Sequence, residues 1–185
     1  MRRYVALFGA INVGGNRLTM ADLRHAFARE GFEAVETVVA SGNVLFDFDE
    51  RPSDGLEDLF AHMMRERFDM RSYVAVRTRD ELAALLAADP FPDGDDANVH
   101  ALLLSGEPDP AALARLIADH APRGPERIAA GPRALFIDYV AGVGQSRLSN
   151  AFIERRLGLS GTARNRRSLR RILAKLDGDA PPPRQ

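Results

Sequence analysis

The chain has no cysteine and no tryptophan among its 185 residues. Without cysteine it cannot form disulfides, cysteine-ligated zinc sites, iron–sulfur clusters or a thiol nucleophile. Long apolar runs are also lacking, since the first one ends at Ile11, far short of the ~20 residues that span a bilayer. Arg2 and Arg3 precede this run as in a leader peptide, but no small-residue cleavage site follows. We therefore expect a first strand and a cytoplasmic protein.

Charge is nearly balanced over the whole chain but not along it. Residues 1–143 carry 15 arginines against 23 acidic residues, whereas residues 144–176 carry eight arginines and Lys175 against Glu154 alone. The C-terminal part is therefore a basic block that follows an acidic body. Such asymmetry predicts either an element that binds anions or a segment that docks on the acidic body.

The first half of the chain has the pattern of an α+β domain. Its first strand is apolar on both faces, which predicts burial on both sides. Thr19 and Asp22 form an acidic capping box, and Ser41-Gly42 is a hairpin signal. The resulting βαββαβ order is the ferredoxin-like split. The predicted elements are a strand over 4–12, a helix from Thr19 to Gly31, strands over 34–40 and 43–48, a helix from Asp54 and a strand over 72–77.

The second half repeats part of this order. Thr78 and Glu81 form a capping box for a further helix, and the polar segment 91–96 has the composition of an inter-domain linker. The elements after it read βαββα, and a last helix over 165–176 has no counterpart in the first half. These elements are a strand over 98–104, a helix capped by Asp109, a hairpin of 126–129 and 134–139, and a helix over 148–157.

We therefore predict an α+β protein of two subdomains, the first ferredoxin-like and the second a smaller, degenerate copy. The predicted parts are a first subdomain over 1–78, a helix and linker over 79–97, a second subdomain with basic C-terminal helices over 98–176, and a disordered tail over 177–185.

Polar segments that contain glycine lie at three predicted element boundaries. In a βαββαβ sheet the first and third strands are antiparallel neighbours, so Asn43 is expected beside Asn12. The same asparagines and glycines also suit tight turns, where positive φ is needed, without any ligand. The candidate ligand-binding residues are Asn12, Gly14, Gly15, Asn16, Ser41, Gly42 and Asn43 on one wall, and Ser146, Arg147, Arg164 and Asn165 on the other.

The third of these segments, Gly142 to Arg147, precedes a predicted helix that Ser146 is placed to cap. Arg147, Arg155 and Arg156 lie close by in sequence, so an anion could bind at this helix start. A flexible loop followed by a helix cap explains the same residues without a ligand.

Metal and cofactor sites receive no support from the sequence. The four histidines fall on three predicted helices and one strand, with no pair at metal-ligand spacing. No phosphate-binding glycine loop and no dinucleotide fingerprint is present. We accordingly expect no metal and no cofactor.

Three classes of function stay open. The leading hypothesis is a non-enzymatic module that binds an anionic ligand, which would be a nucleotide, a phosphorylated metabolite or nucleic acid. The arginines of the C-terminal helices are the nucleic-acid candidates, although a solvated or docked face explains them equally. The alternatives are a small hydrolase or transferase that uses Ser146 or His100 between the subdomains, and a structural protein-interaction module.

Four motifs occur in order along the chain: YVALFGAINVGGNRLTM from Tyr4, SGNVLF from Ser41, YVAGVGQSRLS from Tyr139 and TARN from Thr162. Together they resemble a bacterial family of uncharacterised proteins, domain of unknown function 1697. The resemblance covers about 170 residues. It implies a bacterial cytoplasmic protein of two small α+β subdomains, the first ferredoxin-like, with no established activity.

This chain departs from the family pattern at a few positions. The family usually has Arg-Gly where Gly9 and Ala10 stand, an arginine in place of Gln145, and a tryptophan in place of Arg166. Two positive charges and one stacking aromatic are therefore missing. If the family shares a site for an anion or a base, the departures imply a weaker or a changed ligand in this member.

Overall fold

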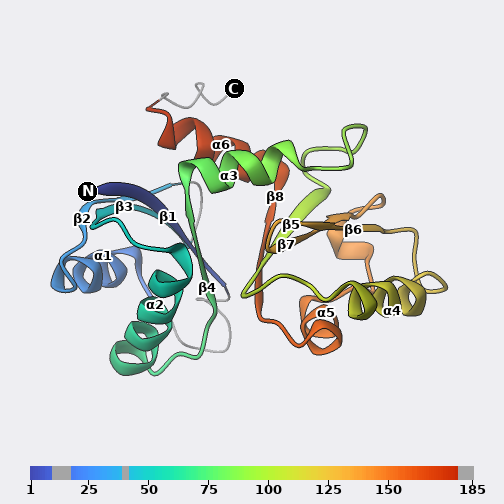
Figure 1. The fold of residues 1–185 in the computed structure, drawn as a ribbon, viewed down its shortest axis with the longest axis horizontal. Coiled ribbons are helices and arrows are strands. Elements are labelled where there is room, and N and C mark those ends of the chain that lie inside the picture. The colour runs from blue at the N-terminus through green and yellow to red at the C-terminus, as the bar shows by residue number, and fades with distance from the viewer. Residues whose placement is uncertain (10–17, 39–41, 179–185) are drawn as a thin grey trace. The chain divides into compact units, whose positions relative to one another are not determined.

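The computed structural model describes residues 1–9, 18–38 and 42–178, which form two compact units (Figure 1). One unit consists of Met1–Leu82 together with Arg171–Gln185, and the other of Ala83–Arg170. The helices α3 (Arg79–Ala87) and α6 (Arg166–Leu176) each contain residues of both units. The predicted division at residues 78, 97 and 176 stays a prediction.

The first unit is an antiparallel four-stranded sheet with the strand order β2-β3-β1-β4. Two helices, α1 and α2, connect its strands in the predicted βαββαβ order and lie on one face of the sheet (Figure 1). The elements are β1 (Arg2–Phe8), α1 (Met20–Arg29), β2 (Glu33–Thr37), β3 (Asn43–Phe48), α2 (Ser53–Phe68) and β4 (Val74–Thr78).

Two predicted helix starts are confirmed in detail. Thr19 caps α1: its hydroxyl accepts a hydrogen bond from the Asp22 N–H at 3.1 Å, and the Asp22 carboxylate accepts from the Thr19 N–H. Thr78 and Glu81 make the same reciprocal pair at α3. The predicted start of α2 at Asp54 is wrong by one residue, since the helix begins at Ser53 after Pro52, without a side-chain cap.

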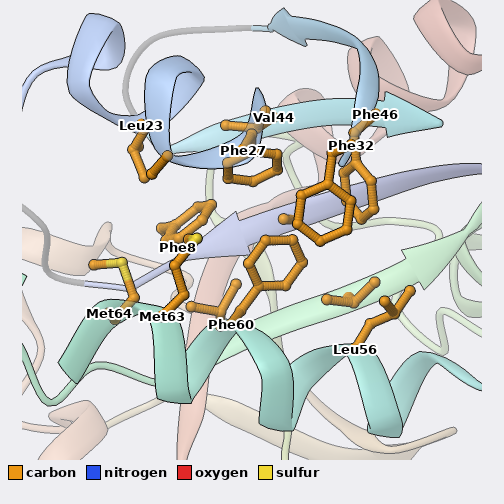
Figure 2. Close-up of a cluster of buried hydrophobic side chains, with 14 of the residues drawn as sticks. Phe8, Leu23, Phe27, Phe32, Val44, Phe46, Leu56, Phe60, Met63 and Met64 are labelled. Carbon is orange, nitrogen blue, oxygen red and sulfur yellow. The ribbon is translucent and has the colours of Figure 1, made fainter. Parts of the chain in front are cut away.

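The core of the first unit is an aromatic cluster between the sheet and its two helices (Figure 2). Phe27 of α1 lies at its centre, with ring centroids 4.9 Å from Phe60 and 5.5 Å from Phe46. The opposite face of β1 is also buried, because Val5 and Leu7 have no exposed surface. The prediction of a first strand buried on both faces is therefore confirmed for the described residues.

The second unit has the same topology as the first, which corrects the prediction of an incomplete copy. Its sheet has the order β6-β7-β5-β8, and the chain passes through it as βαββαβ. The missed strand is β8, which holds the short polar run Gly161–Asn165. The elements are β5 (Val99–Leu104), α4 (Pro110–His120), β6 (Arg127–Gly131), β7 (Ala134–Asp138), a single 3-10 turn (Val143–Gln145), α5 (Asn150–Leu157) and β8.

The last helix has a counterpart after all. Helix α6 follows β8 as α3 follows β4, so the chain is two successive βαββαβα repeats. The caps correspond as well: Thr78 accepts from the N–H three residues on in the first repeat, and Asn165 accepts from the Ser168 N–H at 2.8 Å in the second. Within the described part of the chain, no helix has both the length and the apolar character needed to cross a membrane.

Candidate functional site

Most of the first predicted wall, Asn12, Gly14, Gly15, Asn16 and Ser41, lies outside the described residues. The two that are described, Gly42 and Asn43, adjoin the end of β1, while the expected neighbour Asn12 is among the residues outside the description. Asn43 pairs with Leu7, and the Gly42 carbonyl accepts a hydrogen bond from the Phe8 N–H at 2.7 Å.

Both described residues support the backbone around β3. Gly42 has φ 86°, a left-handed conformation that glycine adopts without strain. Asn43 is 2% exposed and donates from Nδ2 to the Val38 carbonyl at 3.1 Å, while the Val38 N–H donates to the Asn43 carbonyl. These contacts fit the alternative in which the residues shape a turn. A ligand-binding role for this wall stays a prediction.

Ser146 does not cap α5, contrary to expectation. The cap is Ser149, whose hydroxyl accepts from the Phe152 N–H at 3.2 Å. Ser146 lies in the preceding turn, where its hydroxyl accepts from the Leu148 N–H at 3.0 Å and bonds to the carboxylate of Glu126. Leu148 is buried in the core, so Ser146 anchors the entry into α5.

Glu126 is the centre of a buried polar network in the second unit. Its carboxylate lies 2.7 Å from Nε2 of His120, and both side chains are at most 5% exposed. Burial alone would raise the pKa of Glu126, but hydrogen bonds from Ser146, its own N–H and His120 outweigh burial and lower the pKa. A carboxylate with a lowered pKa is a weak general base. Gly124 packs against this carboxylate, where a Cβ atom would not fit.

His100, the other predicted catalytic candidate, lies next to this network. Its ring is 5.1 Å from that of Tyr139, and its β5 position pairs with Asn165 of β8. Burial lowers the pKa of His100, with partial compensation from the Ala97 carbonyl 3.1 Å from Nε2. Burial and the charge of Glu126 raise the pKa of Tyr139 to about 12. The structure thus brings Ser146, His100 and Asn165 into one polar region, although Ser146 bonds to a carboxylate instead of a histidine.

Arg164 is separated from its neighbour Asn165. Successive strand residues point to opposite faces, and Ala163 packs into the core beneath α4 and α5, so Asn165 shares that face and Arg164 does not. Arg164 donates from Nη1 to the Ala163 carbonyl at 2.8 Å and to the Thr162 hydroxyl at 3.2 Å. Burial lowers its pKa to about 10.

Arg147 is exposed and has no ion pair or hydrogen-bond partner in the part of the chain that the structure describes. Arg123 and Phe152, which the sequence did not single out, lie in contact at the same helix. The guanidinium of Arg123 lies 5.1 Å from the ring centroid of Phe152, and that of Arg156 lies 5.2 Å from it. The Arg156 contact is a local pair four residues apart within α5, whereas the Arg123 contact joins the segment after α4 to α5, so no local pattern could have predicted it.

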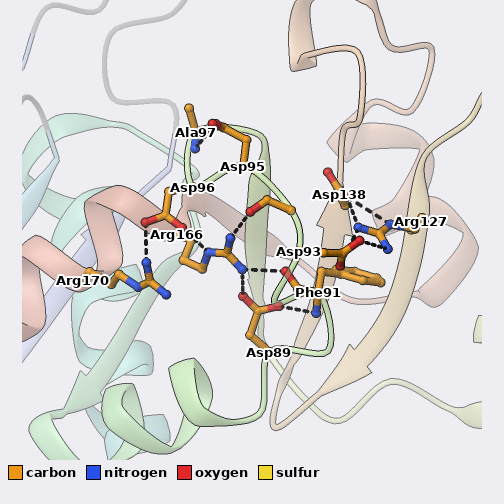
Figure 3. A network of polar contacts seen from close by, with 11 residues as sticks. Asp89, Phe91, Asp93, Asp95, Asp96, Ala97, Arg127, Asp138, Arg166 and Arg170 are labelled. Atoms are coloured by element: carbon orange, nitrogen blue, oxygen red, sulfur yellow. Dashed lines mark hydrogen bonds and ion pairs between the residues drawn. The ribbon is translucent and has the colours of Figure 1, made fainter.

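The basic block is partly neutralised by acidic residues from other segments. Arg166 is 5% exposed and donates to the carboxylates of Asp89 and Asp96 and to the carbonyls of Phe91 and Gly94 (Figure 3). Elsewhere in the block, Arg156 pairs with Asp119, Arg170 with Asp96 and Lys175 with Glu36. These basic side chains therefore contact acidic residues, as one of the two interpretations of the charge asymmetry predicts.

A cavity of about 440 Å³ lies beside the segment that Arg166 holds. Arg127 lines this cavity and donates hydrogen bonds to Asp138 and Asp93 (Figure 3). Its guanidinium carbon lies 4.7 Å from the Phe91 ring centroid. The acidic side chains of this cavity are thus largely engaged with one guanidinium. Among the described residues, no group of three histidine or acidic side chains is placed to hold a metal ion.

A family described as "Protein of unknown function (DUF1697)" matches residues 1–136. The chain belongs to this family. The match ends before the Tyr139 and Thr162 motifs, which carry the second-unit candidates.

The fold is shared with a conserved bacterial protein, SP0830 from Streptococcus pneumoniae. The TM-score is 0.66 at 22% identity, over 94% of this chain and 98% of that one. At this identity the likeness shows the two-unit α+β fold alone. No curated protein matches the chain.

Proposed function

We propose that the protein binds a phosphate-bearing anionic ligand without transforming it, and that the second unit supplies the cationic contacts. The contacts come from the arginine surface, which we define as Arg123, Arg147, Arg155 and Arg156. Arg123 and Arg156 contact Phe152. The observation that carries the proposal is the exposed guanidinium of Arg147, for which the described chain provides no carboxylate.

Two members of this surface contact one aromatic ring, and a third follows a residue of a polar network. Arg123 and Arg156 contact the same ring, so their guanidinium carbons are no more than about 10 Å apart. Arg147 follows Ser146, which bonds to Glu126, and Glu126 bonds to His120. The His120 carbonyl in turn accepts from the Arg123 N–H at 2.7 Å. One network therefore positions both Arg123 and Arg147.

Nearby acidic side chains neutralise one of these charges. Asp119 pairs with Arg156, which is the one ion pair of this surface within the described chain. Glu154 accepts a hydrogen bond from the Gly161 N–H at 2.8 Å, and Glu126 is buried among its own donors. Guanidinium groups that are fixed against an aromatic ring bind phosphate oxygens with little loss of side-chain entropy.

Calorimetric titration with pyrophosphate and with ADP, at about 50 mM salt, tests the proposal. Each arginine that bonds to phosphate contributes about 1.5–3 kcal/mol, and 1.4 kcal/mol is a tenfold change. We expect the double variant R123A/R147A to lose affinity at least about 100-fold by this measure. The matched control is R24A/R65A, which removes two exposed arginines of α1 and α2 and should bind as the wild type does. Unchanged binding by R123A/R147A, or no binding by the wild type, contradicts the proposal.

A second candidate is a hydrolase or transferase with His100 as its base. It is favoured by the position of His100 beside Asn165 and by the lowered pKa of the ring, which keeps a neutral base available near pH 7. The prediction is turnover of a chromogenic phosphate or carboxylic ester that H100Q abolishes. The control H25Q, which changes an exposed histidine of α1, should keep that turnover. Equal rates in the two variants would remove this candidate.

A further inference from the structure

Helix α6 combines a strong positive charge with an apolar side that is already buried. Its sequence RRSLRRILAKL contains five basic residues and no acidic one. Leu169 and Ile172 are at most 1% exposed, so they belong to the interior. The side that faces solvent carries Arg167, Arg170 and Arg171.

These three guanidinium groups differ from Arg166 in their availability. Arg167 and Arg171 are exposed, and their guanidinium groups have no partner in the described chain. Arg170 bonds to Asp96 through Nη1 alone, and its side chain stays 59% exposed. Four residues of helix rise about 6 Å, so three cationic groups lie within one turn.

This arrangement is unfavourable for the isolated helix. Like charges three and four residues apart destabilise a helix by about 0.2–0.5 kcal/mol for each pair. Arginines in the first turn also oppose the helix dipole, which favours negative charge there. A polyanion laid along this side would relieve both effects.

We propose that the exposed side of α6, consisting of Arg167, Arg170 and Arg171, is a docking surface for the phosphate backbone of nucleic acid. The surface has no residue in common with the arginine surface, so it goes beyond the function proposed above. Charge complementarity selects the partner, because this side of the helix offers three guanidinium groups and no large apolar side chain that is exposed.

An anionic membrane is the poorer partner for α6. Interfacial helices bind membranes by burying an apolar face among the lipids. In α6 that face is already occupied, since Leu169 and Ile172 are packed inside the protein. Backbone phosphates need only cationic contacts, and they bind without sequence preference.

The test is fluorescence anisotropy of a labelled 20-base-pair duplex with the full chain at 50 and 200 mM salt. Three phosphate contacts predict a slope of about −2.7 in a plot of log K against log salt, which is about a 40-fold loss between these concentrations. With one contact left in R167A/R171A, the slope should fall to about −0.9 and the loss to about 3- to 4-fold.

Control variants separate this surface from general charge and from folding. R167K/R171K keeps the charges and should keep the steep slope, while R24A/R65A removes two exposed arginines elsewhere and should also keep it. R167A/R171A should retain the circular dichroism spectrum of the wild type, since neither side chain has a partner in the described chain.

The outcomes that overturn the proposal are distinct. No binding of the duplex at about 100 µM protein and 50 mM salt, a concentration at the upper end of the usual non-specific dissociation constants, refutes it. An unchanged slope in R167A/R171A places the duplex elsewhere, and a slope reduced only by R123A/R147A assigns it to the arginine surface. Binding to phosphatidylserine vesicles without binding to the duplex would make α6 a membrane contact instead.

Discussion

Replacing Arg166 by alanine removes the centre of a buried ion-pair network in the second unit. The guanidinium holds the segment between α3 and β5 through the carboxylates of Asp89 and Asp96 and two backbone carbonyls. The side chains of Arg166 and Asp89 are 6% and 7% exposed. R166A would therefore leave a buried carboxylate without its counter-charge.

The expected loss of stability follows from these contacts. Removing one partner of a buried ion pair costs about 3–5 kcal/mol. Each carbonyl that loses its donor without gaining water adds about 1–3 kcal/mol. For a chain of this size 1 kcal/mol shifts the melting temperature by about 2–4 °C, so loss of the ion pair alone should make R166A melt about 6–20 °C below the wild type, and the two carbonyls add to this shift.

Thermal unfolding followed by circular dichroism measures this shift. The matched control is R167A, the next residue on the same helix, which is exposed and should change stability by no more than about 0.5 kcal/mol. R166K keeps a charge but cannot reach four acceptors, so its melting temperature should be intermediate. The double variant D89N/R166A should be less destabilised than the sum of its single changes. If R166A melts within 2 °C of R167A, roughly the limit of resolution, the network does not hold the segment.

Three further changes test other parts of the structure. N43A removes the donor to the Val38 carbonyl from a buried site, and it should lower the free energy of unfolding in urea by about 1–3 kcal/mol. E126Q should cost a similar amount, because a carboxamide cannot accept from Ser146 and His120 as the carboxylate does. His100 has a folded-state pKa below its usual 6.5, so the unfolded chain binds more protons and stability falls as pH drops below about 6.5. H100Q should lose less stability than the wild type between pH 7.5 and 5.5, and equal losses would contradict the assignment.

The sequence predicts the first repeat well because its signals are local. The Thr19 and Thr78 capping boxes depend on residues three apart, and continuous apolar runs mark β1 and β3. The short polar strand β8 has no such pattern. Gly161–Asn165 becomes a strand because it pairs with β5, a contact between residues about 60 positions apart that no local preference encodes.

The candidate site was predictable only in part for the same reason. The sequence identifies Ser146, Arg147 and Asn165 by their glycine-rich and polar neighbourhoods. It cannot show that Ser146 bonds to Glu126, since that contact forms only when the turn before α5 packs against the segment after α4. The basic block likewise appears uniform in sequence, yet Arg166 is buried while Arg167 is exposed.

The two repeats differ in where they place a corresponding glutamate of the second helix. Arg77 of β4 and Arg164 of β8 occupy corresponding positions, each just before the residue that caps the next helix. In the first repeat Glu57 of α2 bonds to Arg77 at 2.7 Å and also accepts from the strand backbone at Val76. Glu154, the fifth residue after the cap of α5 as Glu57 is after Pro52, accepts from Gly161 instead. The same fold therefore places its acidic side chains differently in the two units: Glu57 bonds to an arginine of its own sheet, and Glu154 bonds to a strand backbone.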